Sequence, residues 1–217
     1  MSRFCTRTAC AVVLVVSACV AGCATRLAVV TTPTYPDYPV PVVPPDLADD
    51  PAVPAHERAW LFLQSGDLDE AELGFVTALG TSPAFYPSDA GLGFVELSRG
   101  ASDQAIARFD AALAGRPTYV PALIGRGEAL LSVDRVGEAV TSFEAAVEAD
   151  PTLISLRRRI EDLRFSDLTA QVAQARAARD GGRSDEARAA YERLIDASPD
   201  SGFLYLELAE VEQRDGR

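Results

Sequence analysis

The sequence contains no lysine and no asparagine, so all 20 of its basic residues are arginines. The acidic residues number 32, which gives a formal net charge of −12. Nucleic acid is therefore disfavoured as the main ligand, because binding to phosphates needs a basic surface.

Histidine and cysteine are also scarce. His56 is the only histidine, and the four cysteines all lie within the first 23 residues. The rest of the chain has too few His and Cys side chains for a zinc site, and it cannot form a Cys-His catalytic pair. Carboxylates are plentiful, but they fall at solvated helix positions without paired spacing. We therefore expect no enzymatic activity, no metal and no cofactor, with His56 as a surface residue.

Long hydrophobic runs are absent as well. The apolar run Ala9–Val20 follows Arg3 and Arg7, and its length of about 12 residues is too short to span a membrane but typical of a secretory signal peptide. It ends in Val-Ala-Gly-Cys at residues 20–23, which resembles the lipobox of bacterial lipoproteins. An ordinary signal peptide with a chance cysteine is the alternative.

The lipobox resemblance implies a signal peptide over residues 1–22 and a lipid attached to Cys23. Acyl chains anchor a protein through roughly 0.8 kcal/mol per buried CH₂ group. Ala24 rather than Asp follows the cysteine, which by resemblance favours an outer-membrane lipoprotein facing the periplasm. The inner membrane and the cell surface stay open as alternatives.

Residues 23–51 form a proline-rich linker after the proposed lipid site. Eight prolines lie between Thr25 and Pro54, and proline removes a backbone donor, so neither a helix nor a central strand is expected. We predict a disordered tether with polyproline-like stretches. An alternative is that the stretch Tyr35–Pro41 docks into an aromatic groove, as proline-rich ligands do.

After residue 52 the pattern of small, aromatic and proline residues recurs every 34 residues. In Val120–Leu153 it comprises Gly127, Leu130, Ala139, Phe143, Ala146 and Pro151. This order resembles the tetratricopeptide repeat, a pair of antiparallel helices. It predicts an all-α fold, an α-solenoid of about four and a half repeats: three contiguous units at 52–153, a helical insertion at 154–167, and a fourth unit plus the first helix of a fifth at 168–217.

The glycines of the repeats have a structural interpretation. Gly91 and Gly93, like Gly125 and Gly127, do not continue into a phosphate-binding motif and follow no strand pattern. We interpret them as sites of close helix packing. A second set is expected to end the first helices in the left-handed conformation: Gly66, Gly100, Gly182 and Gly216.

The insertion at 154–167 keeps helical spacing of its apolar residues. Because 14 residues make nearly four turns, it should join the next repeat in one helix from about Thr152 to Arg179. A break near Ser166 is the alternative. Its arginines, at positions 157, 158, 159 and 164, are interpreted as a solvated face that Glu161 and Asp162 partly neutralise. Contact with an acidic partner or with lipid headgroups is the alternative.

In proteins of the resembled family, the first helix of each repeat lines a concave face that binds peptides. Mapped onto this chain, that face gives candidate partner-binding residues: Trp60, Leu63, Phe94, Leu97, Ile124, Glu128 and Arg176. Chaperone-binding members hold a carboxylate with Lys, Asn and Arg. The matching positions here carry other residues, which disfavours that partner class: His56, Trp60, Gly91, Pro121 and Gly125.

These features indicate a lipid-anchored, non-enzymatic scaffold that binds a protein or peptide partner in the bacterial envelope. It is similar in plan to tetratricopeptide lipoproteins that assist outer-membrane barrel assembly, secretin assembly or wall-synthase regulation. The alternative is a self-associating structural element. The last predicted helix, residues 203–211, is too apolar for a terminal cap, so further sequence or a second chain should cover it.

Overall fold

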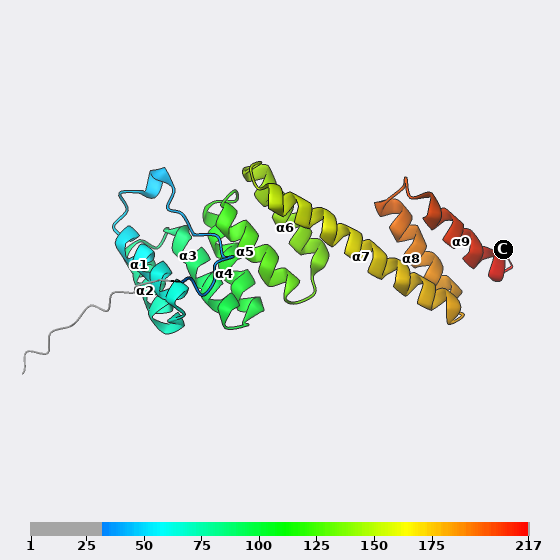
Figure 1. Cartoon of the computed structure of the whole chain (residues 1–217), viewed down its shortest axis with the longest axis horizontal. Coiled ribbons are helices and arrows are strands. Elements are labelled where there is room, and N and C mark those ends of the chain that lie inside the picture. The colour runs from blue at the N-terminus through cyan, green and yellow to red at the C-terminus, as the bar shows by residue number, and fades with distance from the viewer. Residues whose placement is uncertain (1–31, 217) are drawn as a thin grey trace, which may run out of the picture.

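The computed structural model describes residues 32–216. Within that range it is all-helical, as predicted, and its α-helices follow one another as a solenoid (Figure 1). The signal peptide, Cys23 and the first part of the linker lie outside the described residues. The elements are η1 (Pro45–Leu47), α1 (Val53–Ser65), α2 (Leu68–Thr81), α3 (Tyr86–Ser98), α4 (Ser102–Gly115), α5 (Val120–Leu131), α6 (Val136–Ala149), α7 (Ile154–Asp180), α8 (Ser184–Ala197) and α9 (Gly202–Arg214).

The first helix of a pair ends in a residue with positive φ. The predicted glycines have φ values of +83° at Gly66, +75° at Gly100, +73° at Gly182 and +75° at Gly216. In the third pair the equivalent position is Asp134, with φ of 60°, because aspartate tolerates this conformation better than most residues. The left-handed turn is thus kept where glycine is replaced.

Large aromatic rings fill the space between the helices. Phe75, Phe109, Phe143 and Tyr191 are fully buried, one from the second helix of each pair. A Cβ atom on Gly93 would lie 2.6 Å from the ring of Phe109, and one on Gly125 would lie 2.3 Å from it. The prediction that these glycines serve close packing is confirmed.

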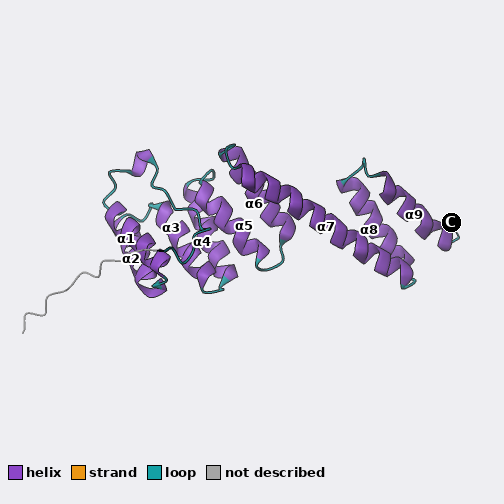
Figure 2. Ribbon diagram, in the orientation of Figure 1, coloured by secondary structure: helices purple, strands orange, loops and turns teal. Residues whose placement is uncertain are grey.

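The helix α7 joins two separate hydrophobic cores. Its first half packs Leu156 and Ile160 into the core of α1–α6, whereas Val172, Ala175 and Ala178 belong to a second core with α8 and α9. The predicted long helix is confirmed, and it runs unbroken past Ser166 (Figure 2). Among the described helices none is long and apolar enough to cross a membrane.

Residues 34–50 differ from the expectation of a free tether. They lie along the solenoid as an extended segment with one short 3-10 helix (Figure 1). Val43 and Leu47 pack against a small core formed with Phe85 and Ala52. Prolines exclude regular secondary structure here, but they leave carbonyls and apolar surface free to pack against the helices.

Candidate functional site

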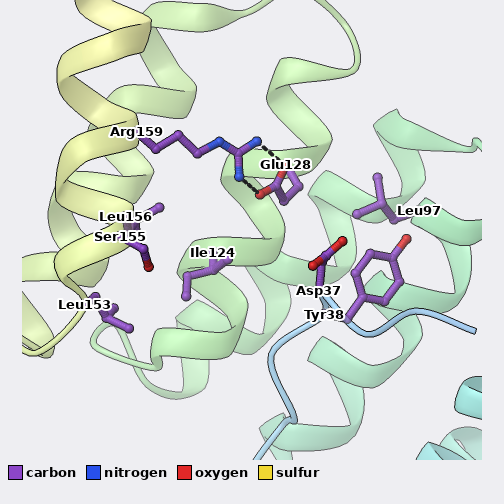
Figure 3. Close-up of a pocket in the computed structure, with 9 residues that line it drawn as sticks. All are labelled: Asp37, Tyr38, Leu97, Ile124, Glu128, Leu153, Ser155, Leu156 and Arg159. Atoms are coloured by element: carbon purple, nitrogen blue, oxygen red, sulfur yellow. Dashed lines mark hydrogen bonds and ion pairs between the residues drawn. The ribbon is translucent and has the colours of Figure 1, made fainter. Parts of the chain in front are cut away.

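An open groove lies on the face formed by α3, α5 and the start of α7, with the N-terminal segment as its fourth wall (Figure 3). Its volume is about 680 Å³. We call it the open groove, and its lining residues are Asp37, Tyr38, Leu97, Ile124, Glu128, Leu153, Ser155, Leu156 and Arg159.

One side of the open groove is closed by an ion pair between α5 and α7. Arg159 donates from both terminal nitrogens to Glu128, with 2.9 Å between Nη2 and Oε2. The guanidinium carbon of Arg159 also lies 5.2 Å from the centroid of the Phe143 ring, at cation–π distance. The two contacts fix the arginine, so its position is set before any ligand arrives.

Aliphatic side chains and one tyrosine give the groove its apolar surface. Leu97, Ile124 and Leu153 are half-buried, so each keeps part of its surface accessible. Tyr38 lies beside Leu97 and across the groove from Leu153 (Figure 3). Burial raises the pKa of its phenol. A groove with apolar walls and a fixed charged pair can receive apolar side chains of a partner while hydrogen-bonding its polar groups.

The structure brings together only some of the residues predicted from the concave face. Leu97, Ile124 and Glu128 line the open groove. Trp60 instead lines a second hollow, of about 410 Å³, between α1 and residues 40–43. Leu63 and Phe94 are fully buried.

Arg176 lies far along the chain from the open groove, in the second core region. It hydrogen-bonds to Glu207 on α9, at 2.9 Å between Nε and Oε1. Glu207 also accepts from Arg179 at 2.7 Å and from the hydroxyl of Tyr191 at 3.0 Å. Arg176 therefore contributes to a network that holds α9 against α7 and α8.

The expectation that His56 is a surface residue is wrong. Its side chain is only 2% exposed, between the rings of Phe75 and Phe85. Its Nε2 lies 2.9 Å from the carbonyl oxygen of Pro41 and donates to it. Its Nδ1 lies 3.0 Å from Oγ of Ser88 and accepts its hydroxyl proton. Burial lowers the pKa of His56, which favours the neutral ring.

The arginines of the insertion are exposed, as expected, and two of them form ion pairs with acids on other helices. Arg159 pairs with Glu128 on α5, and Arg164 pairs with Glu144 on α6. The expected acids, Glu161 and Asp162, lie on α7 itself. These ion pairs link α7 to α5 and α6. The sequence of α7 alone does not predict them, because the acidic partners lie on other helices.

Leu153, Leu156 and Arg159 line the groove without having been predicted as site residues from the sequence. Tyr38 belongs to the stretch Tyr35–Pro41, for which docking was the alternative to a free tether. The available signal was the pair of tyrosines within a proline-rich stretch. Among the described residues, no group of three or more His, Cys, Asp or Glu side chains is placed to hold a metal ion.

The architecture is that of an α-solenoid repeat protein. Models of the tetratricopeptide repeat match residues 91–154 and residues 168–211. The chain therefore contains tetratricopeptide repeats, in agreement with the recurrence at 34 residues. A search of curated proteins finds no match.

Solved structures with the same fold include several tetratricopeptide domains. The first such domain of Spaghetti (RPAP3), bound to the HSP90 peptide SRMEEVD, is 17% identical with a TM-score of 0.51, covering 53% of this chain and 94% of that one. The first domain of human RPAP3 is 18% identical with a TM-score of 0.50, covering 52% and 90%. The domain of Arabidopsis OM64 is 19% identical with a TM-score of 0.50, covering 53% and 95%. At these identities the likeness concerns the fold alone.

Proposed function

We propose that the protein is a lipid-anchored, non-enzymatic adaptor of the bacterial envelope that binds a segment of a protein partner in the open groove. The observation that carries the proposal is the groove itself, about 680 Å³ in volume, with half-buried aliphatic walls and a fixed Glu128–Arg159 pair. Such a surface suits an extended or helical peptide with apolar side chains.

The charge of the groove bears on the kind of partner. Asp37 and Glu128 both line it, and Glu128 already neutralises Arg159. An acidic peptide such as SRMEEVD, the HSP90 peptide bound by the Spaghetti domain, would meet the carboxylates of Asp37 and Glu128, and the lining arginine, Arg159, is already paired. The proposed partner segment is therefore apolar with neutral or basic flanks, because like charges across an interface disfavour binding.

The binding site can be tested by site-specific photocrosslinking in cells. A photoreactive residue at position 124, inside the groove, should give a discrete adduct, whereas one at Leu73, which is 61% exposed on α2 outside the groove, should not. Adding Leu97→Arg, a second lining position, should remove the adduct at 124. Equal adducts from both positions, or an adduct insensitive to Leu97→Arg, would contradict the proposed site.

The lipid anchor is supported by the lipobox-like residues 20–23 and is tested separately. Cys23→Ser should move the protein from the membrane fraction to the aqueous phase of a detergent extraction, because the acyl chains supply the anchoring free energy. The matched control is Cys19→Ser, four residues earlier within the apolar run. A Cys23→Ser protein that stays in the membrane fraction would contradict the anchor.

A second candidate function is self-association through α9. Its exposed apolar side chains favour this: Phe203 is 44% exposed, Tyr205 47% and Leu206 70%. Apolar side chains gathered on one terminal helix are the usual sign of a contact surface.

A further inference from the structure

The extended segment Thr34–Val42, here called the resident segment, lies over the first helices of the first three repeats. Its contacts run from α1 through α3 to Tyr119 at the start of α5. It therefore covers the N-terminal part of the same face whose continuation is the open groove (Figures 1 and 3). The side chains beneath it form a second binding surface, which we call the cradle: His56, Gln64, Phe94, Ser98 and Tyr119.

The cradle contacts the backbone of the resident segment at several points. Gln64 accepts from Tyr35 N at 3.3 Å and donates to Tyr35 O at 3.1 Å. The carbonyl of Gln64 accepts from Thr34 N at 2.8 Å. Further along, the Tyr119 hydroxyl donates to Val42 O at 3.0 Å. Backbone contacts of this kind recognise an extended peptide whatever its side chains.

The polar groups of the cradle are buried. His56 is 2% exposed, Tyr119 5% and Gln64 7%. A buried polar group left without a partner is destabilising, so the side chains of the cradle need an extended backbone, or water, against them. The cradle therefore binds an extended backbone through specific polar contacts as well as through apolar packing.

Aromatic packing supplies selectivity for side chains. The ring of Tyr38 stacks on that of Tyr35, with centroids 5.0 Å apart, and lies 4.9 Å from that of Phe94. Its hydroxyl accepts from Ser98 at 3.4 Å. Trp60 contacts the edge of Phe94 at 6.0 Å between centroids. Aromatic pairs of this geometry are favourable beyond the burial of their area, so aromatic side chains are preferred at these two positions.

We propose that the cradle is a receptor for an extended segment with two tyrosines spaced as in Tyr-Pro-X-Tyr, and that the resident segment is its intramolecular ligand. A partner segment of this chemistry binds by displacing the resident one. Tethering gives the resident segment an effective concentration of about millimolar, so it lowers the apparent affinity of any competitor for the cradle. The inference concerns a surface beside the open groove, and it can fail while the proposed function stands.

The test uses a fluorescent peptide of residues 32–43 and full-length protein in non-ionic detergent, followed by fluorescence anisotropy. Weakening the resident segment with Tyr35→Ala and Tyr38→Ala should tighten binding of the peptide at least tenfold relative to wild type. Adding Gln64→Ala should remove that gain, because Gln64 contacts the peptide backbone in the cradle. A peptide with both tyrosines replaced by alanine should not bind.

The matched control is Tyr205→Ala, an exposed tyrosine on α9, which should leave the affinity at the wild-type value. If the double variant does not fold by circular dichroism, Tyr38→Ser alone should still tighten binding, since it keeps the contacts of Thr34, Tyr35 and Pro41. Equal affinity in wild type and variant, or a gain that persists with Gln64→Ala, would overturn the proposal. So would a wild-type dimer that exchanges segments between copies.

Discussion

At the scale of single residues, glycines and phenylalanines define how closely the helices approach. The ring of Phe109 lies between Gly93 in the same repeat and Gly125 in the next, and a Cβ on either glycine would overlap it. Both glycines approach the Cε1 and Cζ atoms of the ring, and Phe109 is fully buried, so it has little room to move away from an added methyl group. Glycine is disfavoured within helices by about 1 kcal/mol relative to alanine, and close packing is the compensation.

Gly125→Ala is therefore expected to destabilise the protein. The added Cβ would lie 2.3 Å from Cζ of Phe109, and overpacking of this kind typically costs about 1–3 kcal/mol. The thermal midpoint measured by far-UV circular dichroism should fall. Gly137→Ala is the control, because nothing lies within 4 Å of its added Cβ, and its midpoint should stay the same or rise. A similar midpoint for both variants would contradict the packing role.

The buried position of His56 makes the stability of the protein depend on pH. The folded pKa of His56 is below the usual 6.5, chiefly because burial disfavours the charged ring. The unfolded chain thus binds the proton more readily than the folded one. The stability that neutral His56 contributes is therefore fully present above about pH 6.5 and is lost as the pH falls through the lowered pKa. The fall in thermal midpoint from pH 7.5 to 5 should be smaller in His56→Gln than in wild type. Other groups titrate in both proteins, so identical slopes would argue against His56.

At the scale of elements, the helix pairs could be predicted because glycine, aromatic and proline positions recur together. Gly127 lies against the ring of Phe143, and Ala59 is buried against Gly74 of the second helix of its pair, as their small size and spacing indicate. The path of residues 34–50 could not be predicted, since its contacts join residues far apart in sequence, such as Tyr119 and Val42. The composition of the stretch Tyr35–Pro41 indicates that it could dock, but local patterns hold no information on which residues it would contact.

Local sequence patterns also predict the open groove only in part. The concave face was predicted from helix periodicity, and Leu97, Ile124 and Glu128 indeed line the open groove. Periodicity does not show what covers a helix face, so the burial of Phe94 beneath Tyr38 was not foreseen. Nor does it show that Arg159 reaches across to Glu128.

The helix α7 allows a prediction at this scale, because its middle lies between the two cores. Phe165 there is 73% exposed, and neither core includes Ser166. Ser166→Pro removes a helix hydrogen bond and clashes with the preceding turn, at a cost of about 3 kcal/mol. The two cores should then unfold separately, with two calorimetric transitions and rapid tryptic cleavage after Arg164.

Ser166→Ala is the control for α7, because alanine keeps the helix. It should unfold like wild type and resist trypsin at Arg164. If Ser166→Pro gives the same calorimetric trace as Ser166→Ala, the two cores are not coupled through α7.

At the scale of the whole molecule, the two ends of the solenoid differ. The N-terminal end is covered by residues 34–50, which bury Phe85 and His56. At the other end α9 packs Leu204 and Val211 inward and leaves Phe203 and Leu206 largely exposed. Residues 34–50 thus cover the helices against which they pack, whereas α9 keeps apolar side chains exposed in the described residues.

This asymmetry makes self-association measurable. If α9 is a contact surface between copies, the sedimentation coefficient should rise with protein concentration, and Leu206→Glu should abolish the rise, because a charge in an apolar contact is costly to bury. Phe165→Glu is the matched control: an exposed apolar side chain on α7 is changed in the same way, and self-association should persist. A monomer at all concentrations would exclude self-association and leave the groove-binding adaptor as the function to pursue. Association lost equally in both variants would indicate nonspecific hydrophobic contact, because α9 alone would then not account for it.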